Sequence, residues 1–388
     1  MENERSRFYC PELDCLRFVA FLAVFVNHLD QQFHSVVKLD SPGEWMFLCI
    51  VKSGLFGVDL FFCLSSFLIT MLLLREYDLR GSIDVRAFWI RRILRIWPLY
   101  YVFLLLSAIV FSPWLQQQLL GGWRFVNYWF FLGNWDCVYH DWHHSPIGPL
   151  WSISVEEQFY LAWPLLLLAV SPGRILPLAV AALIGANLFR LVHGTSNFVQ
   201  QWANTLYQVD PIAWGAIAAY FARANRLNFS IPLRSVLFLT GVGVMPSYFF
   251  CHGFDTFFHG KDVMLFPLSA FCCILVVVSL YDLKGVPWNG RIMKTWAYLG
   301  RISYGLYVFH MLAMTWVVLQ LYGYGAYGGE VIGMFAGIKW VGFAASLGLT
   351  ILLAWISYTF LETPFLKLKK KFTYIPSSPT TRGNDPKP

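Results

Sequence analysis

Apolar runs of about twenty residues alternate with short polar segments from Leu13 to Phe360, and that length is what a helix needs to cross a bilayer. Ten such runs can be drawn, at residues 13–31, 54–74, 96–112, 147–170, 175–193, 205–222, 234–251, 262–281, 302–321 and 337–361. No stretch between them is long and polar enough to form a separate soluble domain. The pattern predicts an all-α fold, a polytopic membrane bundle of about ten transmembrane helices over residues 1–372, with a disordered cytoplasmic tail over 373–388.

One aromatic segment does not fit this series. Gly121–Trp135 is apolar but only fifteen residues long, which is too short for a span. Counting it as an eleventh span would also place the basic KLKKKF stretch outside the cell. We therefore expect a re-entrant or interfacial segment near 121–135.

Composition and charge support a membrane protein. Hydrophobic residues make up 57% of the chain and charged residues 13%, against roughly a quarter in soluble proteins. Most lysines and arginines fall in the segments that ten spans place on one side, so the positive-inside rule puts both termini in the cytoplasm. The net charge of +7 is thus explained by topology, and we expect no nucleic-acid partner. Because the eight cysteines form no CxxC pair, and HDWHH at 140–144 has no second cluster beside it, we expect no metal.

The first apolar run, Leu13–Leu29, carries Asp14 and Arg17 at its start and His28 near its end. Arg17 and His28 leave one stripe of a helix, about 20° apart and roughly 16 Å along the axis, which is half the bilayer's hydrocarbon thickness. His28 could take a proton from an alcohol, and Arg17 suits a phosphate or carboxylate. Alternatively, Arg17 anchors the helix at the headgroups and His28 caps its outer end.

The second run, GVDLFFCLSSFLIT, contains Asp59 and Ser65. Small residues there favour close helix packing, but a buried carboxylate must find a partner or stay protonated. We expect that partner to be a histidine or arginine on the first helix.

The third run begins with Arg91, Arg92 and Arg95, which can converge on one helical face and, with Arg17, would bind a polyphosphate such as coenzyme A. Membrane anchoring is the alternative. In the fourth run, Glu156 and Glu157 point about 100° apart and should have different partners. One is expected to face a polar cavity and the other to bind a backbone group or an arginine.

Aromatic residues and a second histidine complete the candidates. Tyr307 and His310 are three residues apart and share a face of the ninth run. Trp151 lies at the start of WSISVEE. Packing alone is the alternative for Tyr307 and His310.

Six motifs occur in order from Glu12 to Phe372: LDCLR with its Arg-x10-His spacing, GVDLFFCLSSFLIT, RRILRIWPLYY, PLWSISVEEQFYLAWP, RISYGLYVFH and LETPFLKLKKKF. Together they resemble the acyltransferase-3 family of integral-membrane carbohydrate O-acyltransferases. The resemblance implies transfer of an acyl group, usually acetyl, from cytoplasmic acyl-CoA to a hydroxyl of a carbohydrate or glycolipid, such as a lipopolysaccharide or exopolysaccharide. It implies the bacterial cytoplasmic (inner) membrane as the location.

The resemblance also assigns roles. The expected catalytic residues are His28, Asp14, Glu156 and Glu157, and the expected acyl-CoA-binding residues are Arg17, Arg91, Arg92 and Arg95. Apart from the resemblance, the residues expected to bind substrate are Asp59, Ser65, Trp151, Tyr307 and His310. His28 would act as a general base or as a transient acyl carrier, with Asp14, Asp59 or a glutamate tuning its charge.

Two other classes of function remain open. A transporter or flippase for a glycolipid could line its path with these charges, although the sequence shows no internal repeat. A non-catalytic component of a polysaccharide-assembly complex would need no acyl-CoA.

Overall fold

The computed structural model describes residues 8–32, 41–110, 124–142, 145–194, 197–254, 264–283, 290–322 and 336–375. Every regular element in these residues is helical, which confirms the all-α prediction. Residues 376–388, most of the expected tail, lie outside the described part of the chain.

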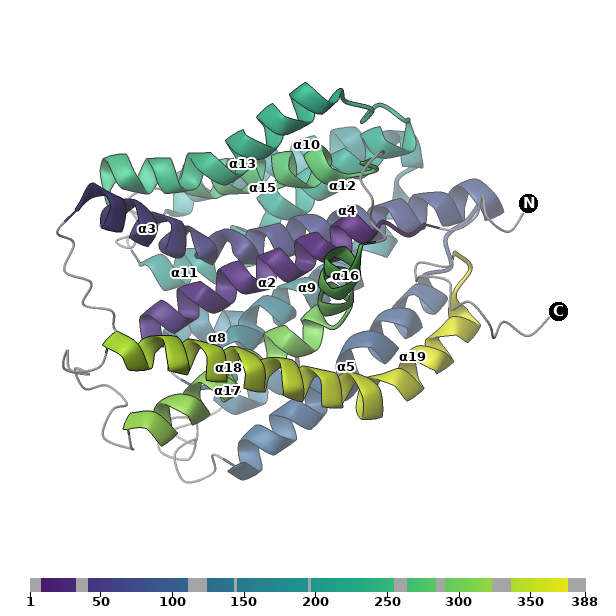
Figure 1. Cartoon of the computed structure of the whole chain (residues 1–388). Coiled ribbons are helices and arrows are strands. Elements are labelled where there is room, and N and C mark those ends of the chain that lie inside the picture. Colours follow the sequence, from purple (N-terminus) through teal and green to yellow (C-terminus); the bar gives the residue numbers. More distant parts are fainter. Residues whose placement is uncertain are drawn as a thin grey trace.

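Each of the ten predicted runs corresponds to one long helix (Figure 1). These are α2 (Pro11–Gln32), α4 (Gly57–Arg80), α5 (Val85–Val110), α9 (Trp151–Ala169), α10 (Ile175–His193), α12 (Val209–Arg223), α13 (Ile231–His252), α15 (Leu265–Leu280), α17 (Ser303–Tyr322) and α18 (Ala336–Ile356). Shorter helices connect or cap them: α3 (Pro42–Ser53), α7 (Arg124–Trp129), α8 (Gly133–His140), α11 (Phe198–Trp202), α16 (Arg291–Arg301) and α19 (Thr363–Lys369). A π-helical turn, Ser357–Glu362, joins α18 to α19.

Within the described residues, five segments are long and apolar enough to cross a membrane: Pro42–Arg80, Val85–Ile109, Pro172–His193, Ile231–His252 and Val341–Phe372. Two apolar helices are shorter, Leu265–Leu280 and Ser303–Val318. The chain therefore has the helices of a membrane protein, while ten crossings stay a prediction. Helix α2 is not among the five, and its charged and polar residues at both ends lower its hydropathy.

The aromatic segment expected near 121–135 forms α7 and the start of α8 where it is described. The hydroxyl of Tyr100 on α5 donates to the carbonyl of Tyr128 at 2.7 Å, and Tyr128 itself is fully buried. Asp136, also buried, accepts from Arg124 at 3.2 Å. The first bond ties α7 to the middle of α5 and the second ties α7 to α8, so this segment packs as two short helices.

Helix α2 lies between the two halves of the bundle, with α10, α12, α13 and α15 on one side and α5, α17 and α18 on the other (Figure 1). Glycines allow its close contacts. A Cβ atom at Gly57 would lie 2.6 Å from the carbonyl oxygen of Ala20, and one at Gly300 only 1.7 Å from that of Asp14. Backbones can approach so closely only where the side chain is a hydrogen atom. Helices α4 and α16 therefore hold α2 from two directions.

The bundle has two ends, which we call the Arg17 end and the His28 end after the residues of α2. At the Arg17 end, Arg223 of α12 donates to Asp78 of α4 at 2.9 Å. At the His28 end, the indole of Trp45 on α3 donates to the carbonyl of Phe250 on α13 at 3.1 Å. The sequence did not predict α16, which crosses α2 at the Arg17 end.

Candidate active site

A pair of histidines occupies the His28 end of α2. Nδ1 of His28 lies 2.9 Å from Nε2 of His310 on α17, with the ring planes 14° apart. His310 is completely buried, and its Nδ1 hydrogen-bonds the carbonyl of Tyr307 in the preceding turn. His28 is half-buried. The hydrogen-bond partner of His28 is thus a second imidazole, not one of the carboxylates that the sequence suggested.

Tyr307 extends this site toward α9. Its hydroxyl lies 2.7 Å from the hydroxyl of Ser152 and donates to the carbonyl of Pro149 at 3.1 Å. The ring of Phe61 meets Tyr307 edge-on, with ring centres 5.9 Å apart. These contacts fix the turn of α17 that carries His310.

The two adjacent glutamates have different partners, as predicted. Glu156 accepts from Ser65 of α4 at 2.8 Å and from the hydroxyl of Tyr160 at 2.9 Å. Glu157 accepts from the indole of Trp97 on α5 at 3.0 Å. None of these three hydrogen bonds comes from a backbone group or an arginine, so that part of the expectation is wrong. Both glutamates keep some exposure, unlike a sealed structural pair.

Arg91 has a structural environment. It forms a buried ion pair with Glu76 of α4 at 3.1 Å and donates to the carbonyl of Phe372 at 2.7 Å. Its side chain is 9% exposed and that of Glu76 is 3% exposed. Arg91 therefore joins α4, α5 and the segment after α19, and its charge is already balanced.

Arg92 and Arg95 are placed differently. The guanidinium of Arg92 lies 5.6 Å from the centre of the Tyr160 ring and makes no ion pair within the described chain. Arg95 donates to the carbonyl of Arg301 at 2.9 Å and lies 3.9 Å from Glu362 of the π-helical turn. π-helical turns are common at functional sites.

Lys369, at the end of α19, lies near these cations. Its charged form is repelled by Arg92, Arg95, Arg91 and Arg17, which shows that the arginines lie within electrostatic range of one place in the fold. Arg17 has a carboxylate partner in Asp14, at 3.2 Å and one turn away on α2. A cluster with this excess of positive charge favours a polyanionic ligand. The sequence analysis did not single out Lys369, which lies in the basic KLKKKF stretch after a long apolar helix.

Polar groups lie at intervals between the two ends of the site. Glu156 lies within electrostatic range of Arg17 and Arg92. Tyr307 lies within the same range of Glu156, and its carbonyl accepts from Nδ1 of His310. We call this series the polar path: Arg17, Arg92, Glu156, Ser65, Tyr307, His310 and His28. It runs alongside α2 from one end of the bundle to the other.

Asp59 does not belong to the polar path, and the prediction of its partner is wrong. Its carboxylate accepts from Ser269 of α15 at 2.6 Å, not from a residue on α2. It is 1% exposed and lies close to the buried Arg190–Asp210 ion pair. Helix α4 turns this side chain away from α2 because Gly57, two residues earlier, is packed directly on α2.

Trp151 is 5% exposed and packs among aromatic rings. Its ring centre lies 5.9 Å from that of Trp142 and 6.4 Å from that of Phe62. It begins the helix that carries both glutamates, and it contributes to the wall of the His28 end.

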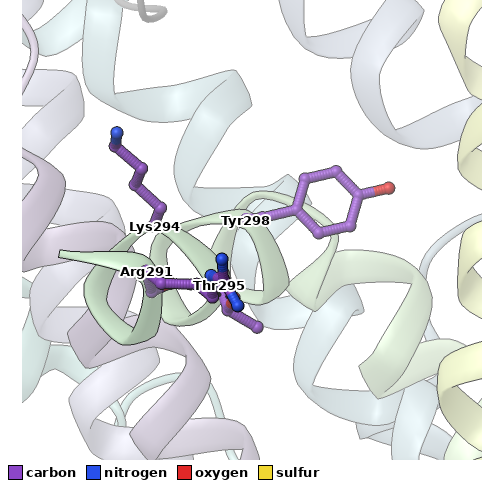
Figure 2. A pocket seen from close by; sticks show the side chains of 4 residues that line it. All are labelled: Arg291, Lys294, Thr295 and Tyr298. Atoms are coloured by element: carbon purple, nitrogen blue, oxygen red, sulfur yellow. Dashed lines mark hydrogen bonds between the residues drawn. The ribbon is translucent and has the colours of Figure 1, made fainter. Parts of the chain in front are cut away.

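A separate cavity of about 460 Å³ lies on α16, lined by Arg291, Lys294, Thr295 and Tyr298 (Figure 2). These side chains form one stripe of the helix and include none of the residues of the polar path. The described residues contain no cluster of three potential metal-ligating side chains. His143 and His144 lie outside the described part of the chain.

Comparison with known proteins decides the family. The family model described as "Acyltransferase domain" matches residues 11–359, nearly the whole described bundle. The chain belongs to the acyltransferase-3 family. Membership of this family favours acyl transfer over the transporter and assembly-component alternatives.

The chain is similar to curated O-acetyltransferases. It is 28% identical over 384 residues to peptidoglycan O-acetyltransferase OatA of Listeria monocytogenes, which covers 93% of this chain and 56% of the relative. It is 27% identical over 396 residues to O-acetyltransferase OatA of Staphylococcus aureus, covering 97% of this chain and 60% of the relative. The chain thus spans less than two thirds of these relatives. No solved structure matches it.

Proposed function

We propose that this acyltransferase moves an acetyl group from acetyl-CoA to a hydroxyl of a carbohydrate. Peptidoglycan is the first acceptor to test, because the Listeria relative is named for it. The observation that carries the proposal is the polar path, which joins a cation cluster at one end of α2 to a histidine pair at the other.

The donor would bind at the Arg17 end. Arg92 and Arg17 offer positive charge to the phosphates of acetyl-CoA, because Arg92 makes no ion pair within the described chain and Arg17 stays 30% exposed beside Asp14. Arg91 and Arg95 are engaged by protein groups. The pantetheine arm would then follow α2 toward His28. The separation of Arg17 and His28, roughly 16 Å, suits an extended thioester arm rather than a compact nucleotide.

The reaction would take place at His28. The imidazole removes the proton from the acceptor hydroxyl, and the oxygen attacks the thioester carbonyl carbon. The C–S bond breaks, and the imidazolium returns the proton to the leaving sulfur, so the products are the O-acetyl ester and free CoA. If His28 is instead the acyl carrier, its nitrogen attacks the thioester carbon and the C–S bond breaks to release the CoA thiolate. The acceptor oxygen then attacks the acetyl carbon, the imidazole leaves, and the hydroxyl proton passes to the thiolate.

The same proposal includes a topology. Ten crossings, with both termini in the cytoplasm and the Arg17 end facing it, would put the donor site where acetyl-CoA is made. Successive long helices reverse direction between the two ends, which supports this count. The bacterial cytoplasmic membrane is the matching location.

The test uses the purified full chain in detergent or nanodiscs with radiolabelled acetyl-CoA and a peptidoglycan oligosaccharide. His28→Ala should abolish acetyl transfer while the protein stays in the membrane fraction and keeps its melting temperature. His252→Ala is the matched control, because His252 is exposed at the end of α13 and outside the polar path. Full transfer by His28→Ala would refute the assignment.

A further inference from the structure

The hydrogen bonds of the histidine pair determine where its protons lie. The carbonyl of Tyr307 can only accept, so Nδ1 of His310 must carry a proton. In a neutral imidazole the other nitrogen then has a lone pair. Nε2 of His310 is therefore an acceptor, and Nδ1 of His28, 2.9 Å away, must be the donor.

This assignment leaves one nitrogen of His28 for chemistry. With its proton on Nδ1, neutral His28 has its lone pair on Nε2. No group in the described residues hydrogen-bonds that atom. A lone pair there can take a hydroxyl proton or attack a carbonyl carbon, so the assignment holds for either role of His28.

The geometry favours a directed bond over a chance contact. The ring centres are 5.1 Å apart with planes 14° apart, so the rings meet edge to edge, where N–H groups and lone pairs lie. His310 is completely buried, and the ring of Phe21 meets it at right angles with centres 6.3 Å apart. Rotation of His310 would break its bond to the carbonyl of Tyr307 inside the protein.

A neutral orienting residue also suits a site inside a membrane. The Ser-His-Asp triad uses a carboxylate to hold its histidine in one tautomer. Burying a carboxylate in a low-dielectric region is costly, and a neutral imidazole supplies the same acceptor without that charge. When His28 becomes protonated, its bond to His310 becomes charge-assisted and stronger.

We propose that His310 is a positioning residue that holds His28 in the Nδ1–H tautomer, which makes Nε2 of His28 the reacting atom. The inference rests on the proposed function, because it concerns the same histidine.

The experiment compares two amides at position 310. The oxygen of glutamine can occupy the place of Nε2 and accept from His28, whereas asparagine is too short to reach it. His310→Gln should keep kcat within about threefold of wild type, and His310→Asn should lower kcat on the order of 10–100-fold, within the contribution of a general base. The KM for acetyl-CoA should stay within about twofold in both, because the donor phosphates bind at the other end of the polar path.

Equal kcat values for wild type and His310→Asn would overturn the inference while leaving the function intact, provided that His28→Ala is inactive. Equal losses in His310→Gln and His310→Asn would show that the ring fills space only. A readout independent of activity is the ¹⁵N spectrum of ring-labelled protein, with His28 assigned by His28→Ala. A proton on Nδ1 and none on Nε2 of His28 is expected, and the reverse tautomer would refute the inference even if the variants do not fold.

Discussion

Arg91 and Arg92 are neighbours in sequence, but the structure predicts that replacing each by methionine affects a different property. Arg91→Met should lower the stability of the fold, and Arg92→Met should lower the affinity for acetyl-CoA. Methionine keeps an unbranched apolar stem and removes the charge. Arg91→Met breaks the buried ion pair with Glu76, and losing one partner of such a pair costs about 3–5 kcal/mol. Glu76 keeps Arg80 at 3.6 Å and the backbone N–H of Asp84 at 2.9 Å, so we expect the lower end of that range.

Arg92→Met should leave the fold intact and weaken the binding of acetyl-CoA. Within the described chain Arg92 has aromatic neighbours but no ion pair to lose. A charge-assisted bond to a phosphate contributes about 1.5–3 kcal/mol, which corresponds to a Kd for acetyl-CoA about 10–100-fold higher.

Two measurements on detergent-solubilised protein separate the effects. Thermal unfolding followed by tryptophan fluorescence should show a melting temperature lower by on the order of 5 °C for Arg91→Met and little change for Arg92→Met. Isothermal titration with acetyl-CoA should show the affinity loss in Arg92→Met. The assignment of a structural role to Arg91 and a binding role to Arg92 would be refuted if Arg91→Met lowered the affinity for acetyl-CoA as much as Arg92→Met does, with no change in melting temperature.

Two further substitutions test local features of the fold. Asp84 caps α5: the backbone N–H of Ala87 donates to it at 2.9 Å, and this bond, with one from Tyr374, lowers the pKa of the carboxyl. The stabilisation that ionised Asp84 provides is therefore present above the ordinary pKa of 3.8 and is lost as the pH falls through the lower pKa of the folded state. Asp84→Ala should lower the free energy of unfolding by about 0.5–2 kcal/mol at pH 7. If the difference between Asp84→Ala and wild type stayed the same below that pH range, the assignment would be contradicted. Gly300→Ala should push α16 from α2 and lower stability by about 1–3 kcal/mol in the same unfolding assay, whereas Gly243→Ala, with open space at its Cβ, should be neutral or stabilising; equal effects would refute the close contact.

The apolar pattern predicted the long helices well, because a helix that crosses or fills a membrane bundle must be apolar over most of its length. It missed α16, whose Arg291, Lys294 and Arg301 suggested a cytoplasmic connection. Helix α16 has only eleven residues, with apolar side chains on one face. A search for apolar stretches of about twenty residues passes over such a segment, which then resembles a loop between two spans. Helix existence was thus predictable, and a helix lying across the bundle was not.

The sequence predicted which residues would belong to the candidate site, but not which of them would contact one another. Most of the candidate residues were recognised because burial of charge is costly, but the buried pair Arg190 and Asp210 was not. The sequence contains no information on which helices are neighbours, so Asp59 was assigned to α2 although α15 holds it. His28 and His310 were both named, yet their contact depends on a packing of α2 against α17 that neither local pattern specifies. Lys369 was missed because membrane anchoring already explained it.

The histidine pair has a consequence for how the protein is made. His28 and His310 are 282 residues apart, so at about 5–20 residues per second His28 waits on the order of 15–60 s after synthesis for its partner. During that interval α2 carries charges at membrane depth, where each costs about 2.5–3.5 kcal/mol at the bilayer centre and less near its ends. The Asp14–Arg17 pair, one turn apart, is local and can neutralise both charges as soon as the helix forms. Insertion of α2 can therefore precede assembly, while a chain interrupted before α17 would be inserted and inactive.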